Sequence, residues 1–513
     1  MNRKTLYACR SRTERILHMS VTRKDKITAV LLCAFFTFCI LYECSQTSPR
    51  FVFSTWVDPH CYLTIAKAIL KGRIPYRDIY DVKGPLLYLL YVPAALISRK
   101  SLSGVFILEA LTGTGALYFT WRYLREKLTA AALPLIFLAG VLLFCFEPFS
   151  AGGSAEEHAL PVLTYCFWKF SSSVQTDTPL GKKSWYLIGI LAGIIFWAKY
   201  SICFILAGAA VMPLFCGFRK KKAAYLRESV IPGLLGIFTV SAPVLLFFFL
   251  HHALSDLFNV YFYSNMFKYA LKVVGSRNYN VFTLFLFYTR AYLPFLILGL
   301  MTAALRKSGR NVLHILFTAA FAFIPLAKLG DPYNYYYLPF WILTLPGLSA
   351  CGTAAGKFLF RKRTFSRITL SAVTAASFLL CLLPGLSGGR NSMYLQVKDP
   401  KDYYPQFRFA KIIDSVPDSV LLQFDQYDTG FYTVAGKDCP VKYITQTMRD
   451  LPELFDEQMD FIEKAGPDFI VATRPDYIFP GYDLIDCRIC DRPFYRCSFS
   501  LYERHSLRNE APQ

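Results

Sequence analysis

The first apolar run of the chain, Ile27-Thr-Ala-Val-Leu-Leu-Cys-Ala-Phe-Phe-Thr-Phe-Cys-Ile-Leu-Tyr-Glu-Cys44, decides the fold class. A helix of about 20 apolar residues crosses the hydrocarbon core of a bilayer, which is ~30 Å thick. A tail rich in Arg and Lys precedes the run, as in a secretory signal, but no small-residue cleavage site follows it and many more apolar runs do. The pattern therefore predicts a retained first membrane span.

The composition agrees with a membrane protein. Of the 513 residues, 54% are hydrophobic, whereas about 45–50% are apolar in ordinary soluble proteins. The net charge of +21 would suit a nucleic-acid-binding protein, but most basic residues lie between apolar runs, where the positive-inside rule places them. The 46 Phe and 33 Tyr residues favour aromatic belts at the two membrane interfaces. The charge pattern thus argues against a nucleic-acid partner.

Further apolar segments predict about eleven spans, within a range of about nine to thirteen. They cover residues 27–44, 102–121, 131–146, 158–170, two parts of 185–217 that separate around Lys199, 230–250, 281–305, 312–326, 336–351 and 368–386. Lys and Arg gather in alternate loops, most clearly in Arg219-Lys-Lys-Lys222, which places those loops and the basic tail 1–26 in the cytoplasm. The predicted fold is mostly α, a polytopic bundle in the plasma membrane. An odd number of spans leaves residues 389–513 outside.

The outer loop 45–101 holds two stretches that do not fit as spans. Pro85–Ile97 is apolar but too short to cross, so it predicts a helix that lies on the outer interface or dips into it. Residues 60–70 form a helical pattern that ends before Gly72, a residue type favoured at helix C-termini. Both helices are expected along the membrane surface.

Residues 389–513 change character and predict a small extracytoplasmic α/β domain. Apolar runs shorten to strand length at 420–424, 469–472 and 499–502, and helical stretches at 404–416 and 451–465 alternate with them. Cys487-Arg-Ile-Cys490 is a CxxC motif, but no second CxxC completes a zinc site. A disulfide and free thiols are both open here.

Asp58, in Ser54-Thr-Trp-Val-Asp-Pro-His60, is the first candidate for chemistry because it follows span 1 at the outer face. A carboxylate there can act as a general base on an acceptor hydroxyl. Asp before Pro is also a good helix start. Both roles are open, and they are compatible.

Basic side chains at the outer face are candidate phosphate ligands. Arg73, Arg77 and Lys83 lie in one stretch of the outer loop, and Lys199 and Lys328 are predicted at outer ends of spans. Contact with lipid headgroups or snorkelling would account for the same positions. Arg290 is harder to explain in that way, since the pattern places it well inside the span 281–305.

Acidic and aromatic residues complete the candidates. Glu156 and Glu157 precede span 158–170, where they would orient an acceptor, bind a cation or stabilise the start of the helix. Glu109 lies within span 102–121, and its partner is not deducible. The cluster Gly330-Asp-Pro-Tyr-Asn-Tyr-Tyr-Tyr337 would stack on a sugar or form an interfacial belt. His251-His252 is not a metal motif, and no P-loop, GxGxxG or nucleophile elbow is present.

Several of these motifs together resemble the first outer loop of the GT-C membrane glycosyltransferases. The similarity is greatest to the group of protein O-mannosyltransferases and lipid A aminoarabinose transferases. It rests on Asp58, Ile65-Ala-Lys-Ala-Ile-Leu-Lys-Gly72, Pro75-Tyr-Arg-Asp78 and Asp81-Val-Lys-Gly-Pro-Leu86, with weaker matches in Ala155-Glu-Glu-His-Ala-Leu-Pro161, Phe196-Trp-Ala-Lys199 and residues 330–339. Members often have His where Tyr335 stands.

The resemblance implies that residues 27–388 form a catalytic domain that transfers a sugar, with inversion, from a polyprenyl-phosphate donor to a glycan, lipid or protein. Asp58 would match the acidic residue that this loop places at the catalytic centre, where it activates the acceptor hydroxyl, and Glu156 or Glu157 would match the second acidic residue. The implied donor-phosphate ligands are Lys83, Arg77, Lys199 and Arg290. Tyr76, Asp81, Tyr333 and Tyr335 would contact the sugar or acceptor. A divalent cation is possible in such enzymes, and no metal ligand is assigned.

Two other classes of function remain open. A transporter or flippase of lipid-linked sugars would commonly have repeated halves and broken midplane helices, whereas here polar groups gather at one face and no repeat is visible. A noncatalytic scaffold would bind a partner through its outer domain. Loss of sugar transfer on Asp58→Asn separates the enzyme from both.

Overall fold

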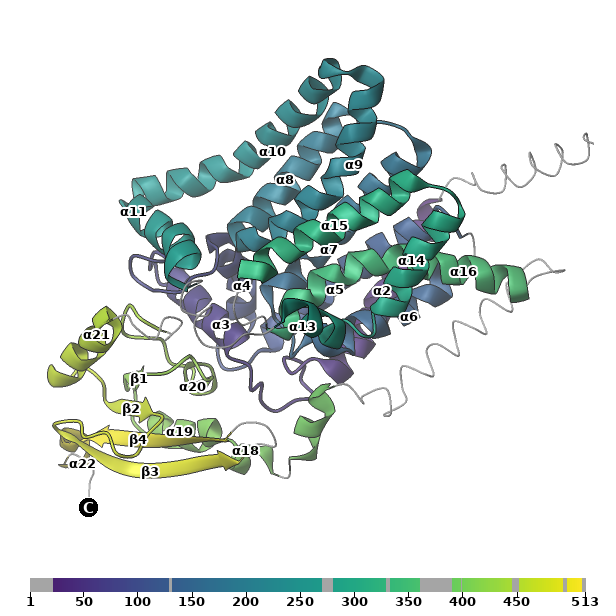
Figure 1. Cartoon of the computed structure of the whole chain (residues 1–513). Helices are drawn as coiled ribbons and strands as arrows, with labels where there is room; N and C mark the ends of the chain where they lie inside the picture. Colours follow the sequence, from purple (N-terminus) through teal and green to yellow (C-terminus); the bar gives the residue numbers. More distant parts are fainter. Residues whose placement is uncertain are drawn as a thin grey trace, which may run out of the picture.

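The computed structural model describes residues 22–128, 132–269, 280–328, 333–359, 390–397, 399–444, 452–491 and 496–509. The predicted span 368–386 and most of the basic tail lie outside these residues. A bundle of long helices carries, at one end, a smaller unit that holds the only sheet in the described part of the chain (Figure 1). The mostly helical fold with a small C-terminal sheet agrees with the sequence prediction.

Five helical stretches are long and apolar enough to cross a membrane: Arg23–Cys44, Lys182–Lys221, Ala223–Leu250, Gly309–Ala327 and Asn334–Ala355. A sixth is the pair α13 (Val281–Tyr288) and α14 (Leu293–Leu305) if it is one span, although the two helices meet at a bend of 97°. The count of about eleven spans is therefore not confirmed. Helices α5 (Ser103–Arg125) and α7 (Ala155–Thr176) occupy two predicted spans but carry buried Glu side chains, and α6 (Ala132–Phe144) is short.

The stretch Lys182–Lys221 is two helices, as the sequence predicts. Helix α8 (Lys182–Lys199) and helix α9 (Cys203–Lys221) are separated by the 3-10 turn η2 (Tyr200–Ile202). Trp185 of α8 donates a hydrogen bond to Tyr225 (3.0 Å), and Trp197 donates one to Ser241 (2.9 Å), so α8 runs parallel to α10 (Ala223–Leu250). Helix α9 therefore runs antiparallel to both, and the chain reverses beside Lys199.

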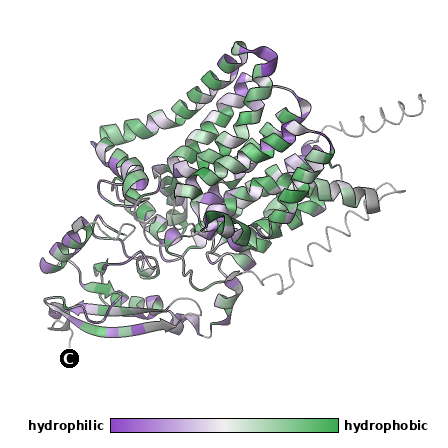
Figure 2. Ribbon diagram, in the orientation of Figure 1, coloured by the Kyte–Doolittle hydropathy of each residue, from purple (hydrophilic) through white to green (hydrophobic). Residues whose placement is uncertain are grey.

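The surface of the bundle is apolar where a soluble protein would be polar. Helix α10 exposes large side chains along its length, including Leu234 (59%), Phe238 (65%) and Phe249 (62%). Figure 2 shows that hydrophobic residues dominate the long helices while hydrophilic ones gather at helix ends and in the C-terminal unit. An exposed apolar surface of this extent fits lipid contact. The chain is a membrane protein.

The outer loop folds as predicted into two helices. Helix α3 (Val57–Leu70) ends before Gly72, whose φ of +81° is a conformation that side chains other than glycine rarely adopt. Helix α4 (Pro85–Ile97) begins with Pro85, a residue suited to the first helical turn. The elements that complete the bundle are α2 (Arg23–Cys44), η1 (Glu147–Phe149), α11 (Leu254–Leu257), η3 (Phe258–Tyr269), α15 (Gly309–Lys328), η4 (Asn334–Thr344) and α16 (Leu345–Leu359).

The C-terminal unit holds a four-stranded sheet in the order β1-β2-β4-β3. Strand β1 (Leu421–Gln423) is parallel to β2 (Phe469–Ala472), while β4 (Arg496–Arg504) is antiparallel to both β2 and β3 (Tyr482–Asp491). Strand β3, which contains the CxxC motif, is a strand that the sequence did not predict. The accompanying elements are η6 (Arg390–Gln396), α18 (Pro400–Tyr403), α19 (Pro405–Asp414), α20 (Phe431–Val434), α21 (Pro452–Glu463) and α22 (His505–Asn509).

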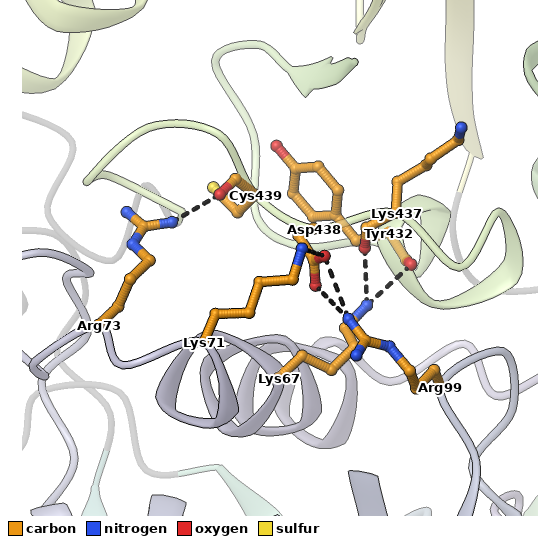
Figure 3. A network of polar contacts seen from close by, with 8 residues as sticks. All are labelled: Lys67, Lys71, Arg73, Arg99, Tyr432, Lys437, Asp438 and Cys439. Carbon is orange, nitrogen blue, oxygen red and sulfur yellow. Dashed lines mark hydrogen bonds and ion pairs between the residues drawn. The ribbon is translucent and has the colours of Figure 1, made fainter. Parts of the chain in front are cut away.

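The outer loop and the C-terminal unit share one hydrophobic core rather than meeting as separate bodies. Buried residues of α3 and α4 belong to the same cluster as β1, β2 and α20. Polar contacts reinforce this packing (Figure 3): Lys67 donates to the carbonyls of Tyr432 (3.0 Å) and Lys437 (2.7 Å), and Arg99 pairs with Asp438 (3.0 Å). The outer loop is therefore the platform on which the C-terminal unit is held.

Candidate active site

A cavity of about 460 Å³ lies between the outer loop, the bundle and the C-terminal unit. Five of the residues proposed from the sequence line it together, namely Asp58, Asp81, Lys83, Tyr333 and Tyr335. They come from α3, from the segment before α4, and from the start of η4. The structure thus gathers residues that are more than 250 positions apart in the sequence into one polar cavity at the end of an apolar bundle.

Asp58 lies in the first turn of α3, and the N-cap position belongs to Trp56. Its Oδ2 atom accepts a hydrogen bond from the Tyr62 hydroxyl at 2.9 Å. Burial and the neighbouring Asp58 carboxylate raise the pKa of Tyr62 well above its usual range, so this phenol stays a donor at neutral pH. Within the described residues the second oxygen, Oδ1, accepts no hydrogen bond. Asp58 is thus held through one oxygen and keeps the other available.

The backbone of Lys83 is fixed from both sides by tyrosines. Tyr76 donates to the Lys83 carbonyl at 2.7 Å, and the Lys83 amide donates to the Tyr88 hydroxyl at 2.9 Å. The same Tyr88 hydroxyl donates to one oxygen, Oδ2, of the buried Asp81 carboxylate at 2.7 Å. Tyr76 is fully buried and does not line the cavity. It positions Lys83 instead of facing the cavity.

The position after Lys83 requires a glycine because the backbone there packs closely against the end of α8. The Gly84 amide donates to the Ala198 carbonyl at 3.0 Å, and an added Cβ would lie 2.0 Å from the Trp197 carbonyl oxygen. No side chain fits at that distance. The outer loop therefore touches the end of α8 at this point, and Lys83 is placed relative to the bundle by that contact.

Aromatic rings form one wall of the cavity. Tyr333 stacks on Tyr335, with ring centroids 5.7 Å apart and planes at 15°. Trp56 meets Tyr335 edge-on at 4.9 Å. Tyr335 is buried whereas Tyr333 is 46% exposed, so the wall is rigid at its base and open toward the cavity mouth. Such faces are suited to packing against a sugar ring.

Glu156 and Lys199 form a buried ion pair beneath this wall. Lys199 Nζ also lies 5.2 Å from the centre of the Tyr335 ring and 4.2 Å from that of Tyr336. Neither Glu156 nor Lys199 lines the main cavity. The pair therefore supports the aromatic wall, and the positive charge of Lys199 is already balanced by Glu156.

Glu157 acts on the backbone of the preceding turn. Its carboxylate accepts a hydrogen bond from the Gly153 amide at 2.8 Å. Gly152 and Gly153 have φ angles of +93° and +78°, and a Cβ on Gly152 would lie 2.2 Å from Ser45 Oγ. Glu109 receives hydrogen bonds from Ser45 (2.7 Å) and Thr47 (2.8 Å) beside this turn. These acids shape the floor of the cavity and do not face into it.

Two predicted phosphate ligands lie away from the cavity. Arg77 pairs with the adjacent Asp78 and donates to the His251 carbonyl at 2.8 Å. Arg290 is 58% exposed and pairs with Glu147 at 3.4 Å. The prediction of one continuous helix over 281–305 is not met, because Arg290 occupies the bend between α13 and α14. A break there lets the guanidinium reach the surface.

Sequence reasoning missed the cavity residues that come from distant segments. Asn391 donates to the carbonyls of Cys44 (2.7 Å) and Ser150 (2.8 Å) and accepts from Gln46 (2.8 Å), so it ties the start of the C-terminal unit to the end of α2. Asp428 accepts from Thr64 at 2.8 Å. An isolated Asn or Asp in a loop carries no sequence signal for such contacts.

Charge in the cavity is mixed. Asp58, Asp81 and Asp428 face it together with Lys83. No group of three or more His, Cys, Asp or Glu in the described part of the chain is arranged to hold a metal ion.

Arg73, a further basic residue of the loop, donates to the carbonyls of Cys439 (2.6 Å) and Val441 (2.7 Å) and so fastens the C-terminal unit.

Comparison with solved structures shows that the helical bundle and its small C-terminal α/β unit have the fold of ArnT. One match is ArnT from Cupriavidus metallidurans bound to undecaprenyl phosphate, with a TM-score of 0.57, 14% identity, and coverage of 92% of this chain and 97% of that one. Its apo state matches with a TM-score of 0.57, 13% identity, and coverage of 95% and 99%. No family model and no curated protein matches.

Proposed function

We propose that this protein is a membrane glycosyltransferase that moves a sugar from a polyprenyl-phosphate donor to an acceptor at the outer face of the plasma membrane. The observation that carries the proposal is the cavity that joins Asp58 and Lys83. It provides one carboxylate with a free oxygen and one cation, at the end of an apolar bundle where a lipid-linked phosphate would lie. The GT-C fold, and the undecaprenyl phosphate bound to the similar ArnT structure, support this assignment.

Asp58 takes the role of general base. Its free Oδ1 accepts the proton of the acceptor hydroxyl while Tyr62 holds Oδ2 in place. The acceptor oxygen then attacks the anomeric carbon, and the bond from that carbon to the phosphate oxygen breaks on the opposite side. This direct displacement inverts the configuration of the sugar.

Lys83 stabilises the leaving polyprenyl phosphate. Negative charge builds on the phosphate oxygen as the glycosidic bond breaks, and a cation fixed in advance lowers the barrier most. The two tyrosine hydrogen bonds to the Lys83 backbone and the contact of Gly84 with α8 supply that fixed position. Arg77, Lys199 and Arg290 are assigned no direct phosphate contact in this arrangement.

The C-terminal unit contributes to the acceptor side. Tyr427 and Asp428, on the loop after β1, line the cavity beside α3. Asp428 is held by Thr64 (2.8 Å), by Gln423 (3.0 Å) and by the amide of Gly430 (3.0 Å). With Tyr333 and Tyr335 this loop offers aromatic and carboxylate surfaces to a hydroxyl-rich acceptor. We assign the acceptor to a glycan, lipid or protein.

The transporter hypothesis has weaker support. The main cavity is closed on one side by the bundle and lies at the end of the helices, whereas transporter sites lie near the midplane. The bend between α13 and α14 is the one broken pair in the described residues, and no described residue of α13 or α14 lines this cavity.

Deletion of the gene, followed by mass spectrometry of polyprenyl-phosphate sugars in membrane extracts, tests the proposal. We expect one such lipid to accumulate in the deletion strain, wild type to clear it, and Asp58→Asn to leave it in place. A lipid that stays constant in the deletion strain would contradict a donor of this class. Transfer of the labelled lipid across vesicle membranes without loss of its sugar would favour a flippase.

A further inference from the structure

A second cavity, of about 270 Å³, lies in the bundle away from the first one. Its walls come from the C-terminal ends of α5, α7 and α14, the start of α15, and α16. Small residues, among them Gly299, Ala303 and Ala350, leave the space between these helices. None of the residues that line it lines the first cavity.

The two cavities lie about one membrane thickness apart along α7. Glu156, at the start of α7, supports the aromatic wall of the first cavity through Lys199, and Gln175, near its end, lines the second. At 1.5 Å per residue the helix places these two positions about 28 Å apart, close to the ~30 Å of a hydrocarbon core. The second cavity therefore lies at the other end of α7, at a separation that matches the two leaflets of a bilayer.

The polar groups of this cavity are suited to an anion. Lys127 and Arg306 supply positive charge, and Ser171, Gln175 and Asn311 supply hydroxyl and amide donors. Of the described residues that line it, none is Asp or Glu. The nearby Glu126 is already engaged, because its oxygens accept hydrogen bonds from Trp168 (2.8 Å) and Ser172 (2.6 Å).

The amine of Lys127 has no anionic partner among the described residues that line the cavity. Within the described part of the chain its Nζ forms no hydrogen bond or ion pair, and it lies 3.7 Å from the centre of the Tyr123 ring. Burial lowers the pKa of Lys127 to about 7. A bound anion would offset this penalty and restore the positive charge. A lysine that only contacted lipid headgroups would extend outward rather than line a cavity between helices.

His314 provides an independent sign of a missing partner. Its side chain lines the cavity and is 2% exposed. One ring nitrogen, Nε2, contacts Ser171 at 3.1 Å, whereas Nδ1 has no hydrogen-bond partner among the described residues. Buried polar atoms are nearly always satisfied in folded proteins, so this wall is incomplete without a ligand or water.

We propose that the second cavity binds a phosphate group, carried either by an anionic phospholipid of that leaflet or by a free phosphate compound. Tetrahedral oxygens accept from several donors at once, which matches the amide, hydroxyl and ammonium groups gathered here. The site is separate from sugar transfer and does not depend on the function proposed for the first cavity.

Ligand-induced stabilisation of the purified full chain in neutral detergent tests the proposal. The unfolding midpoint is followed while inorganic phosphate is added in one series and short-chain phosphatidylglycerol in the other. We expect at least one of them to raise the midpoint of wild type, and the double variant Lys127→Gln, Arg306→Gln to bind it ~tenfold more weakly or worse. A response to the lipid alone identifies a headgroup, and a response to phosphate alone identifies a soluble ligand.

Two controls make the result decisive. Lys183→Gln removes an exposed lysine that lines neither cavity, and it should respond like wild type. Lys83→Gln tests whether the first cavity accounts for the effect. The proposal is overturned if neither probe stabilises wild type, if the double variant responds like wild type, or if the response disappears in Lys83→Gln and persists in the double variant.

Discussion

Replacement of Lys67 by Met tests how the C-terminal unit is held on the outer loop. Lys67 is fully buried, and its ammonium donates to two backbone carbonyls of that unit, at 3.0 and 2.7 Å (Figure 3). Leaving each carbonyl unpaired costs about 1–3 kcal/mol. Against this, burial lowers the pKa of Lys67 to about 8 from its usual 10.5, which corresponds to a cost on the order of 3 kcal/mol for keeping the buried amine charged. At pH 7 we expect the unfolding free energy of Lys67→Met to lie between about 1 kcal/mol above and about 3 kcal/mol below that of wild type.

The lowered pKa of Lys67 determines whether the unfolding free energy rises or falls with pH. Between pH 8 and 10.5 the unfolded chain binds the proton at Lys67 more tightly than the folded chain does, so unfolding free energy rises with pH across this window. The unfolding free energy of wild type minus that of Lys67→Met should therefore increase from pH 7 to pH 10, by up to about 3 kcal/mol. Unfolding midpoints of both proteins in detergent measure the difference, and other titrating groups cancel in the comparison.

Lys71→Met is the matched control, because this lysine lies one turn further along and is 56% exposed in its ion pair with Asp438. Its effect should stay below about 1 kcal/mol and change little with pH. Parallel pH curves for wild type and Lys67→Met would refute the assignment of a buried, charged Lys67 to the contact between the outer loop and the C-terminal unit.

Two further substitutions test the supports of the first cavity. Glu156→Gln leaves the buried Lys199 without its partner and should lower the stability by about 3–5 kcal/mol, while the double variant Glu156→Gln, Lys199→Met should recover part of that loss in a thermal unfolding experiment. Losses that simply add would show that the two side chains are not coupled. Gly84→Ala places a Cβ 2.0 Å from the Trp197 carbonyl and should weaken donor binding through displacement of Lys83. Unchanged binding of polyprenyl phosphate by this variant would contradict the role of that contact.

Local sequence signals predicted the local elements well. Pro85 at the start and a short apolar run define α4, and Gly72 defines the end of α3. The buried run 469–472 coincides with β2, and the reversal beside Lys199 follows the break in the apolar pattern. Each of these features depends on residues close together in the chain, where capping, turn geometry and periodicity act.

Features set by distant contacts could not be predicted. Strand β3 lies at the edge of the sheet and mixes charged with apolar residues, so its pattern is weak without β4 beside it. The family resemblance implies that Tyr76 contacts the sugar or acceptor, but the fold buries it against the Lys83 backbone. Asp428 reaches the cavity only because the C-terminal unit packs on α3. Asp58 and Lys83 were found because they belong to one short, motif-bearing loop.

The most direct test of the account measures release of polyprenyl phosphate from a polyprenyl-phosphate sugar by the purified protein, with a membrane extract that supplies the acceptor hydroxyl, comparing wild type with Asp58→Asn at saturating donor. We predict that kcat falls by about 10²–10⁴-fold, while the affinity for polyprenyl phosphate and the unfolding midpoint stay close to those of wild type, since Asp58 lies at the edge of α3 and is not part of the phosphate contact. Full activity in Asp58→Asn would contradict the claim that this cavity is the catalytic centre.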